Sequence, residues 1–327
     1  MPRDSRFASA GHKFPREGLR GYDEGAGGVN SMDLRDKQAA LEERLRTLGS
    51  VIVAYSGGVD SAYLAWAAHR VLGEKMLAAL ADSASLARSH YADALAFAEE
   101  NGIPLLVLET KELEREAYAA NNGDRCFHCK DELFTVLETE RARRAFGAVA
   151  YGLNLDDGKD FRPGQRAAAE HHVVAPLADA GLNKAEIRSL AEAAGLRVWD
   201  KPASACLSSR IEYGRRVTTD ALRQVEDAEE ALRALGLRRF RVRHHGSVAR
   251  IEIAEEEMAT ALEPGFFRRM AAAVRSAGFP YVAVDCDGYR SGSMNELLPA
   301  EMLRGNQGSR TASEEAVGKA GQRPMTL

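Results

Sequence analysis

The sequence predicts an α/β protein in which an N-terminal domain built on a parallel sheet is followed by a second, smaller α/β domain. Short apolar runs alternate with helical patterns, an order typical of βα units and a parallel sheet. Runs such as Val51–Ala54 are uniformly apolar, which indicates strands covered on both faces. At 327 residues the chain is long enough for two domains, because a single core rarely exceeds about 250 residues.

Composition and periodicity set the expected domain boundaries. Residues 1–31 and 305–327 are rich in glycine, serine and charge, so we expect both tails to be disordered. The loop around Cys206 interrupts every periodic pattern. We therefore expect one domain over residues 32–205 and a second domain over residues 206–304.

The charge balance and the hydropathy pattern exclude several classes of protein. The chain has 44 basic and 48 acidic residues, so no strong positive field would recruit nucleic acid. No apolar stretch approaches the roughly 20 residues that cross a bilayer, and the N-terminus does not resemble a secretory signal. We therefore expect a cytoplasmic protein with neither nucleic acid nor membrane as a partner. In that compartment the four cysteines are expected to be ligands or reactive thiols rather than disulfides.

The expected elements alternate along the first domain, and most are bounded by glycine. They are a helix over Leu34–Leu48, a strand over Val51–Ala54, a helix from Asp60 or Ser61 to Gly73, a strand over Met76–Ala81, a helix over about 86–101, a strand over Pro104–Leu108, a helix opening at Asn121–Lys130 and running through Leu137, a strand over Val149–Gly152, and an amphipathic helix from Asn183-Lys184 to Gly195.

The second domain is expected to mix helices and strands. The pattern predicts a helix over residues 219–235, strands over Phe240–Arg243 and Val248–Ile253, one helix from Met258 to Ala277, and a strand over Tyr281–Asp285. Cys286 ends this last apolar run, so we interpret it as a small buried hydrophobe.

The stretch Ser56-Gly-Gly-Val-Asp60-Ser61 follows the first strand and opens a helix. Glycines let the backbone approach a ligand, and the amides and dipole of a helix N-terminus attract phosphate. Neither a P-loop lysine motif nor G-x-G-x-x-G is present. The stretch resembles the PP-loop of the ATP pyrophosphatases, which cleave ATP to AMP and pyrophosphate; a serine- and glycine-rich turn without a ligand is the alternative.

Two further loops lie at expected carboxyl ends of strands, where ligands bind in doubly wound sheets. Ala81 to Ser83 could reach the adenosine of ATP, although an ordinary strand-to-helix turn is equally compatible with the pattern. Asp156, Asp157 and Asp160 offer hard oxygen ligands for Mg²⁺ near pyrophosphate, or they form a solvated acidic loop.

Three cysteines stand in sequence contexts that suggest reactivity. Cys126 and Cys129 form a C-x-x-C at a helix start, a pattern of redox pairs and of half metal sites, where the helix N-terminus should favour thiolates; two inert buried cysteines are the alternative. Cys206 lies in a loop of small residues ahead of Ser-Ser-Arg210, and Arg210 would favour its thiolate. An inert loop cysteine remains possible there.

Arg241 and Arg243 alternate on a predicted strand, so their side chains share one face. Two neighbouring guanidinium groups suit a substrate phosphate or carboxylate. A solvent-exposed strand face is the alternative.

Taken together, the motifs resemble the LarE family of ATP-dependent sulfur transferases over residues 33–304. They are Ser56–Ser61, Asp124–Lys130, Asp160-x-Arg162-Pro-Gly164, Ala205–Arg210 with Tyr213-Gly214, Arg241-Val-Arg243, Arg250-Ile-Glu252 and Gly288–Asn295. The resemblance implies synthesis of the nickel-pincer nucleotide of lactate racemase. A carboxylate of pyridinium-3,5-biscarboxylic acid mononucleotide would be adenylated by ATP with Mg²⁺, and sulfur would then give a thiocarboxylate and AMP.

The resemblance also implies ATP binding by the domain over residues 32–205, substrate binding and oligomerisation by the domain over residues 206–304, and a homo-oligomer. It further implies site residues and a sulfur source. The catalytic candidates are Asp60, Cys206 and Arg210. The candidates for binding ATP and substrate are Ser56, Gly57, Gly58, Val59, Asp60, Ser61, Ala81, Ser83, Gly152, Arg162, Arg241, Arg243 and Glu252. Cys126, Cys129 and Cys206 match the branch whose three thiolates hold a 4Fe-4S cluster with an extra sulfide. Sacrifice of Cys206, which would leave dehydroalanine, is the other source of sulfur.

Two other classes fit part of the pattern. A tRNA thiolase also combines a PP-loop with three cluster cysteines, but the net charge of −4 argues against a polyanionic substrate. A non-catalytic nucleotide-binding or iron–sulfur scaffold would release no pyrophosphate in response to a small carboxylate substrate.

Overall fold

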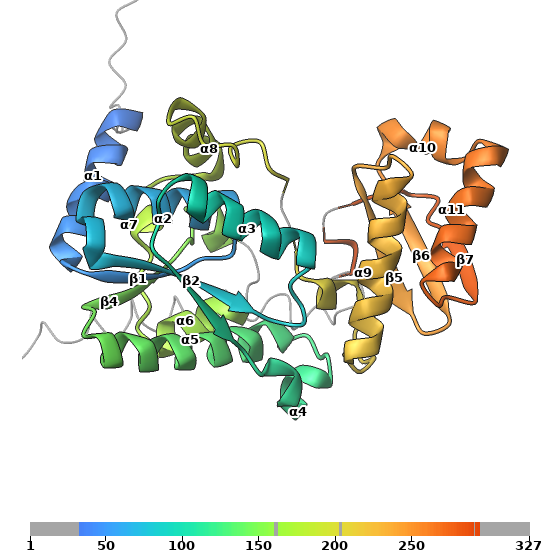
Figure 1. The fold of residues 1–327 in the computed structure, drawn as a ribbon, viewed down its shortest axis with the longest axis horizontal. Coiled ribbons are helices and arrows are strands. Elements are labelled where there is room, and N and C mark those ends of the chain that lie inside the picture. Colours follow the sequence, from blue (N-terminus) through green and yellow to red (C-terminus); the bar gives the residue numbers. More distant parts are fainter. Residues whose placement is uncertain (1–32, 160–162, 203–204, 291, 295–327) are drawn as a thin grey trace, which may run out of the picture.

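The computed structural model describes residues 33–159, 163–202, 205–290 and 292–294, which form two lobes, each with its own sheet (Figure 1). The N-terminal lobe contains α1 (Leu34–Leu48), β1 (Val51–Ala54), α2 (Val59–Leu72), η1 (Gly73–Lys75), β2 (Met76–Asp82), α3 (Arg88–Glu100), β3 (Leu105–Glu109), η2 (Glu112–Glu114), α4 (Glu116–Ala119), α5 (Arg125–Arg144), β4 (Ala148–Tyr151), η3 (Asp156–Lys159), α6 (Pro163–Glu170), α7 (Pro176–Asp179) and α8 (Lys184–Ala193). Among the described residues, no helix has the length and apolar character needed to span a bilayer.

The N-terminal sheet is parallel throughout, in the order β3-β2-β1-β4. Strand β1 is fully buried because it pairs on both edges, with β2 and with β4. The predicted parallel α/β sheet is therefore confirmed, and the four strands predicted for the first domain all lie in it.

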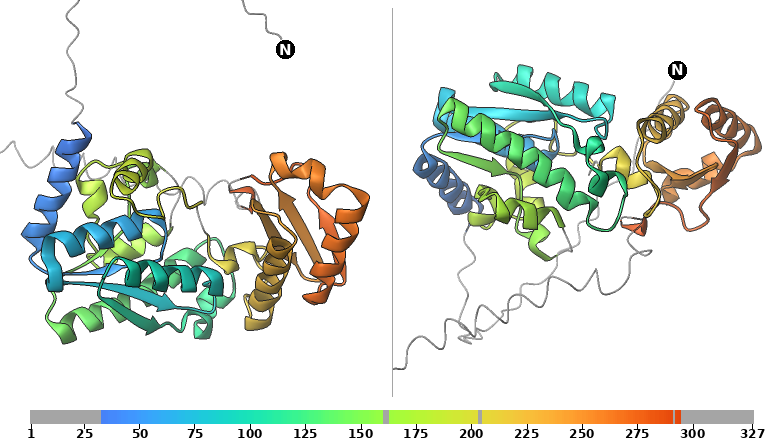
Figure 2. Two further views of the ribbon diagram at one scale, coloured as in Figure 1. Left: turned by 45° about the horizontal axis from the view of Figure 1, so that its top comes forward. Right: turned by 90° about the horizontal axis from the view of Figure 1, so that it is seen from below.

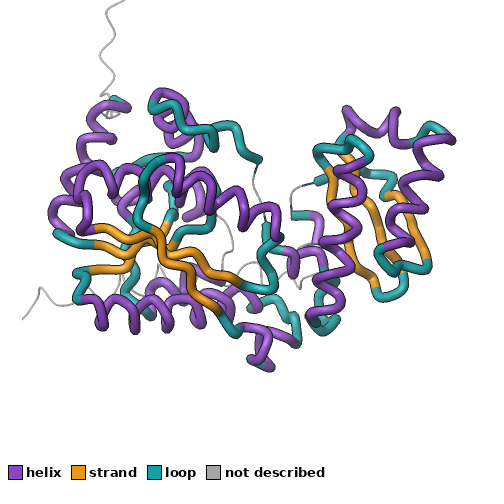
Figure 3. The backbone as a smooth tube through the Cα atoms, viewed as in Figure 1, coloured by secondary structure: helices purple, strands orange, loops and turns teal. Residues whose placement is uncertain are grey.

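Helices cover both faces of this sheet (Figures 1 and 3). Val51 and Val53 of β1 pack with residues of α1, α2 and α3 on one face. Ile52 and Ala54 point to the other face, where they pack with Phe134 of α5 and with residues of α6. Alternate residues of one strand thus enter two separate cores, which explains why the strand is apolar at every position.

The C-terminal lobe holds a three-stranded sheet in the order β5-β6-β7, with β5 antiparallel and β7 parallel to β6. Its elements are η4 (Leu207–Arg210), α9 (Thr219–Ala234), β5 (Phe240–His245), β6 (Val248–Ile253), α10 (Glu255–Ala261), α11 (Pro264–Ser276) and β7 (Tyr281–Val284). One face of the sheet packs on α9 and α11 through a core that includes Val225, Ile251 and Val274.

Two predictions about this lobe are wrong. The single helix expected from Met258 to Ala277 is divided into α10 and α11, because Pro264 starts a new helix at its first turn. Cys286 is exposed rather than buried, since β7 ends at Val284 and the chain turns away from the core.

The order of the strands brings the loops that follow β1, β2 and β4 to the carboxyl end of the N-terminal sheet. The chain runs from β1 through β2 to β3 in one direction across the sheet and then crosses back from β3 to β4 on the other side of β1, which makes the gap between β1 and β4 a switch point for ligand binding. The η4 segment lies between the two lobes, in yellow in both views of Figure 2. The amide of Leu207 donates to Ser85 O at 2.8 Å, so this segment reaches the end of β2.

Candidate functional site

The phosphate loop, residues 56–61, joins β1 to α2 and is held by its own serines. The Ser56 amide donates to Ser61 Oγ at 3.1 Å, and the two hydroxyls lie 3.0 Å apart. Ser61 Oγ also donates to Gly58 O at 3.1 Å. These contacts fix a compact turn in which Ser56 is exposed and α2 begins at Val59, one residue before the predicted start.

Two glycines of the site occupy positions where a side chain does not fit. Gly57 has a φ of +71°, and a Cβ there would lie 2.8 Å from the Cβ of Ala94 on α3. Gly152 follows β4, and a Cβ there would lie 2.8 Å from the amide nitrogen of Ser61. The end of β4 therefore packs directly against the N-terminus of α2, which places Gly152 beside the phosphate loop.

Asp60 stands in the first turn of α2 and pairs with Lys184 at the start of α8. Burial raises the pKa of the Asp60 carboxyl and the Lys184 ammonium opposes that effect. The charge of Asp157 also raises the pKa of Asp60, so two carboxylates share this region. Asp60 Oδ1 is buried and has no hydrogen-bond partner among the described residues. This oxygen and Asp157 suit a hard cation such as Mg²⁺ that also binds phosphate.

The other predicted nucleotide contacts lie near the end of β2 or outside the described residues. Ala81 is half-buried near the end of β2, and Ser83 follows it, with its hydroxyl donating to the buried carboxylate of Glu112. Arg162 and Asp160 lie outside the described residues.

A second part of the site is formed by α4 and the start of α5 together with residues 205–210, here called the Cys206 loop. The Arg125 guanidinium is buried and donates to Ser208 O at 2.9 Å. Cys206 Sγ lies 3.1 Å from Ser208 Oγ. Tyr118 Oη donates to the same hydroxyl at 3.0 Å and also bonds Ser85 Oγ. Contacts from both lobes thus converge on the residues that follow Cys206.

The three thiols of this region differ in acidity. Cys206 is an exposed residue. Desolvation by the surrounding protein opposes ionisation of its thiol, but Arg125 and the bonds from Ser208 and Ser209 outweigh it, so the pKa of Cys206 is lowered. Desolvation raises the pKa of Cys126, which is an exposed residue, and it raises that of the half-buried Cys129 to about 12. The prediction that the helix N-terminus favours thiolates at Cys126 and Cys129 is therefore not supported, because desolvation of the two thiols outweighs the opposing charges of Arg125 and Lys130.

The three thiols also influence one another electrostatically. A charge on Cys206 raises the pKa of both Cys126 and Cys129, which indicates that the three residues lie in one region. Within the part of the chain that the structure describes, however, no group of three histidine, cysteine, aspartate or glutamate side chains is arranged to hold a metal ion. The donor set has the soft ligands that an iron–sulfur cluster takes, but the thiols are not assembled as ligands.

Arg210 is buried in an ion pair with Glu229 of α9, with Nε and Oε1 3.0 Å apart. Its Nη1 donates to the carbonyl oxygens of Ala205 and Cys206 at 2.8 and 3.0 Å. Arg210 lowers the pKa of Cys206, as the sequence suggests, but Arg125 has the larger influence. The guanidinium mainly fixes the backbone of the loop.

The outer face of the C-terminal sheet is polar and partly buried. Arg243 Nη2 donates to Glu252 Oε2 at 2.6 Å and to Ser293 Oγ at 3.0 Å, and Arg250 also pairs with Glu252. Arg243 is 6% exposed, so the alternative of a solvent-exposed strand face does not hold for it. Arg243 Nη1 donates to Ser209 O at 3.3 Å, which connects this face to the Cys206 loop.

Arg241, on the same face, is half-buried and its guanidinium lies over the ring of Tyr289, 5.1 Å from the centroid. Arg241 and Arg243 therefore form a cationic face beside the loop that contains Cys206, as their alternation on the strand predicts.

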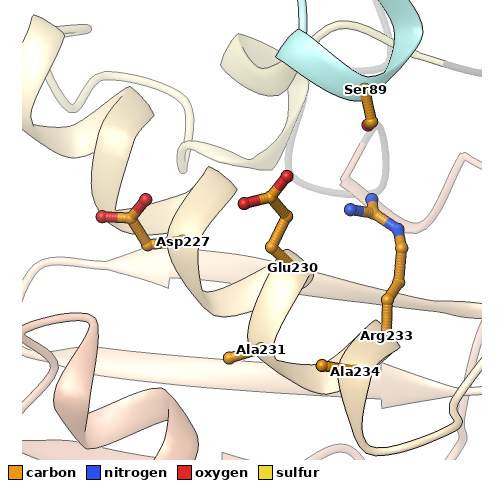
Figure 4. Close-up of a pocket in the computed structure, with 6 residues that line it drawn as sticks. All are labelled: Ser89, Asp227, Glu230, Ala231, Arg233 and Ala234. Atoms are coloured by element: carbon orange, nitrogen blue, oxygen red, sulfur yellow. The ribbon is translucent and has the colours of Figure 1, made fainter. Parts of the chain in front are cut away.

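A separate hollow lies between the start of α3 and α9 (Figure 4). None of its lining residues belongs to the phosphate loop, so we assign it no part in ATP binding. It is lined by Ser89, Asp227, Glu230, Ala231, Arg233 and Ala234.

Sequence reasoning missed three polar residues of the site. Lys184 lies 124 positions from its partner Asp60, and Tyr118 lies 90 positions from Ser208, so no local pattern links them. Arg125 could have been identified, because a cation directly before Cys126 is visible in the sequence.

Comparison with known proteins gives four similarities. Residues 34–150 match the NAD synthase family. The chain is 38% identical over 265 residues to an uncharacterized protein of Synechocystis, covering 81% of this chain and 99% of that protein. It is 35% identical over 271 residues to the pyridinium-3,5-bisthiocarboxylic acid mononucleotide synthase of Lactiplantibacillus plantarum, with 83% and 98% covered. An uncharacterized protein of Methanocaldococcus jannaschii is 27% identical over 251 residues, with 77% and 94% covered.

Proposed function

This chain belongs to the LarE family, which includes the pyridinium-3,5-bisthiocarboxylic acid mononucleotide synthase of Lactiplantibacillus plantarum, and we therefore propose that it is an ATP-dependent sulfur transferase. Its substrate would be pyridinium-3,5-biscarboxylic acid mononucleotide. ATP adenylates a carboxylate of this substrate and pyrophosphate leaves; sulfur then attacks the acyl-adenylate, forming a thiocarboxylate and releasing AMP. The product serves the nickel-pincer nucleotide cofactor of lactate racemase.

One observation carries the proposal: the Cys206 loop is anchored at the carboxyl end of the same sheet as the phosphate loop. Leu207 bonds Ser85 just after β2, and β2 pairs with β1, which leads into the phosphate loop. An acyl-adenylate bound at this end of the sheet would lie between the phosphate loop and a thiol of lowered pKa. Adenylation and sulfur transfer both require this arrangement, because the adenylate must not leave between the two steps.

Adenylation would rely on positioning and on charge. The amides of the phosphate loop and the N-terminus of α2 are candidates to bind the phosphates. Asp60 and Asp157 would hold Mg²⁺, which neutralises charge on the departing pyrophosphate. Lys184, which pairs with Asp60, would stabilise the same charge.

Substrate binding is assigned to the cationic face of the C-terminal sheet. Arg241 and Arg243 would bind the phosphate or the second carboxylate of the substrate. Arg243 Nε is buried and has no partner among the described residues, so it keeps a donor for an anion. Glu252 would orient Arg243, since these two side chains already form a buried ion pair.

For the sulfur source we propose a 4Fe-4S cluster held by Cys126, Cys129 and Cys206, whose thiols must come closer than they are in the described residues. When bound, the cluster would supply sulfide for transfer to the adenylate. Sacrifice of Cys206 is the second candidate, and the lowered pKa of this thiol favours it. We further propose that the enzyme acts in the cytoplasm as a homo-oligomer.

The test is a reaction of anaerobically purified protein with ATP, Mg²⁺, the biscarboxylic acid mononucleotide and sulfide. We expect AMP, pyrophosphate and a thiocarboxylate, with pyrophosphate release dependent on the carboxylate substrate. A scaffold protein would release none. Pyrophosphate release that responds to tRNA, with binding that strengthens steeply at low salt, would instead identify a tRNA thiolase.

A further inference from the structure

Asn121 lies four residues before Arg125, outside every set of site residues considered so far. It is fully buried, and its φ of 58° places it in the left-handed region. Asparagine tolerates this conformation better than most residues, but a buried amide still needs hydrogen-bond partners. The partners of Asn121 all contribute to the geometry around Cys206.

The Asn121 side chain donates to the segment that follows Cys206. Nδ2 lies 3.3 Å from Ile211 O, 2.8 Å from Glu212 O and 3.0 Å from Arg215 O. One amide group has only two N–H bonds, so three carbonyls share two donors. The main-chain oxygen of Asn121 also accepts from the Gly214 amide at 3.0 Å. A single residue thus fixes the course of residues 211–215.

The other end of the same side chain orients Arg125. Asn121 Oδ1 accepts a hydrogen bond from Arg125 Nη1, and this Nη1 also donates to Ser208 O at 2.9 Å. Asn121 therefore connects the helix that carries Cys126 and Cys129 to the region of Cys206 in two ways. Its donors bind the segment 211–215 that follows the Cys206 loop, and its acceptor orients Arg125, which bonds Ser208 within the loop.

We propose that Asn121 is a positioning residue for sulfur transfer, which sets the placement of Cys206 relative to Cys126, Cys129 and the bound adenylate. This inference rests on the proposed function. The hydrogen bonds of its side chain go to Arg125 and to residues 211–215 and not to the phosphate loop, so we expect adenylation to be affected much less than sulfur transfer.

Other contacts keep the two lobes together when the Asn121 side chain is removed. Tyr118 still bonds Ser208, and the Val217 amide still donates to Ala119 O at 2.8 Å. Ala87 and Tyr118 also belong to the same apolar cluster as the core of the C-terminal lobe. A change at Asn121 should therefore loosen the Cys206 loop without separating the lobes.

Two substitutions test this role. Asn121→Gly accepts the positive φ and removes every side-chain bond. Asn121→Asp keeps the acceptor for Arg125 but replaces the donors that bind three carbonyls. Asn101→Ala is the matched control, because Asn101 Nδ2 donates to a single carbonyl, Phe97 O, at 2.8 Å. Thermal melting of each variant verifies that it is folded.

The first readout separates the two half-reactions. For Asn121→Gly we expect substrate-dependent pyrophosphate release within about twofold of wild type. The amount of thiocarboxylate formed per adenylate should fall about tenfold or more, since small misplacements of reacting groups carry such costs. Asn121→Asp should resemble Asn121→Gly, and Asn101→Ala should resemble wild type. Equal losses in both half-reactions, or no loss in either, would overturn the proposal.

The second readout does not depend on the reaction. Dibromobimane becomes fluorescent when it joins two neighbouring thiols, and metal-free protein with Cys286→Ala leaves only Cys126, Cys129 and Cys206 for it. Fluorescent products that join Cys206 to the C-x-x-C helix, identified by mass spectrometry, should fall sharply in Asn121→Gly. Unchanged cross-linking would refute the positioning role. A wild type that cross-links but forms no thiocarboxylate would refute the proposed function alone.

Discussion

At the scale of single residues, one cation separates the chemistry of three neighbouring thiols. Arg125 is the main influence that lowers the pKa of Cys206, and it also opposes the rise at Cys126. Cys129, for which burial is the largest effect, has a pKa of about 12. The directions of these shifts make Cys206 the candidate nucleophile in metal-free protein, although Cys126 and Cys129 stand at the helix start where thiolates are usually expected.

We predict that this difference appears in the pH dependence of alkylation. In metal-free protein, iodoacetamide should modify Cys206 at a lower pH than an ordinary thiol, because its thiolate persists below the ordinary pKa. Cys129 should react only near pH 12 or not at all. Mass spectrometry of each peptide over a pH series measures this. In Arg125→Met the reactivity of Cys206 should move to higher pH; an unchanged profile would exclude Arg125 as the cause.

Asp60→Asn should keep the fold but lose most substrate-dependent pyrophosphate release. The carboxylate has an unpartnered buried oxygen placed for Mg²⁺, and an amide is a much poorer ligand for this cation. Pyrophosphate release at saturating Mg²⁺ is the measurement, with Asp36→Asn on the first turn of α1 as the control. Turnover equal to wild type would remove Asp60 from the catalytic set.

Residue chemistry was predictable where the cause is local and not where it depends on packing. The phosphate loop could be identified because its six residues are contiguous and lie between a strand and a helix. The acidity of Cys126 and Cys129 could not, because sequence spacing carries no information about burial. Lys184 became visible only through the ion pair that the fold creates with Asp60.

At the scale of elements, the turn from β1 into α2 determines whether ATP can bind. Gly57 adopts a positive φ and approaches α3 so closely that a methyl group would lie 2.8 Å from Ala94 Cβ. Gly58, in contrast, has a φ of −79° and ordinary clearance. The two glycines of the motif thus differ: the first is needed for conformation and packing, whereas the second is needed at most for close approach of phosphate.

We therefore predict different effects of alanine at these two positions. Gly57→Ala should lower the free energy of unfolding by about 1–2 kcal/mol from the backbone conformation alone, plus the cost of the contact with α3, and should weaken ATP binding. Gly58→Ala should leave stability nearly unchanged. Chemical denaturation and ATP titration of both variants test this. Equal stabilities for the two variants would contradict the different roles of the two glycines.

The elements themselves were largely predictable from periodicity, and the two errors have physical causes. The apolar strands β1 to β4 alternate with helices because each strand face is covered, which leaves a clear pattern. The division between α10 and α11 was missed because Pro264 at a first helical position continues the apolar pattern instead of interrupting it. Cys286 was misplaced because the sequence does not reveal where β7 leaves its neighbour β6.

At the scale of the whole molecule, the proposed site draws its binding residues from both lobes. ATP would be bound by the N-terminal lobe, and the cationic face of Arg241 and Arg243 belongs to the C-terminal lobe. Arg243 bonds Ser209 O, so the substrate face and the Cys206 loop are mechanically connected.

Arg241→Ala should therefore weaken binding of the mononucleotide substrate and not of ATP. Loss of one charge-assisted contact should cost roughly 1.5–3 kcal/mol of binding free energy. Arg243→Ala should also destabilise the protein by about 3–5 kcal/mol, because it leaves Glu252 buried with a weakened set of partners. Isothermal titration with each ligand and thermal melting measure these effects. A loss of ATP affinity with substrate affinity intact would reverse the assignment of the two lobes.

The sulfur source is a property of the whole molecule, because its three candidate ligands come from two distant segments. Cys126 and Cys129 lie one helical turn apart on α5, and Cys206 lies in the loop between the lobes. If these residues hold a cluster, each single Cys→Ala change should remove or destabilise the iron–sulfur absorption of anaerobically prepared protein. Cys286→Ala should leave this absorption unchanged, since Cys286 lies after β7 and belongs neither to α5 nor to the Cys206 loop.

Turnover then distinguishes the two sources of sulfur. With an intact cluster and excess sulfide, each protein should form more than one product and Cys206 should keep its full mass. Sacrifice of Cys206 would instead stop after a single turnover and remove about 34 Da, the mass of H₂S, as the cysteine becomes dehydroalanine. Measuring iron, product per protein and the mass of the Cys206 peptide in the same sample decides the question. A single turnover with this mass loss and no iron would replace the cluster by the sacrificial thiol, whose lowered pKa already suits it for attack on an adenylate.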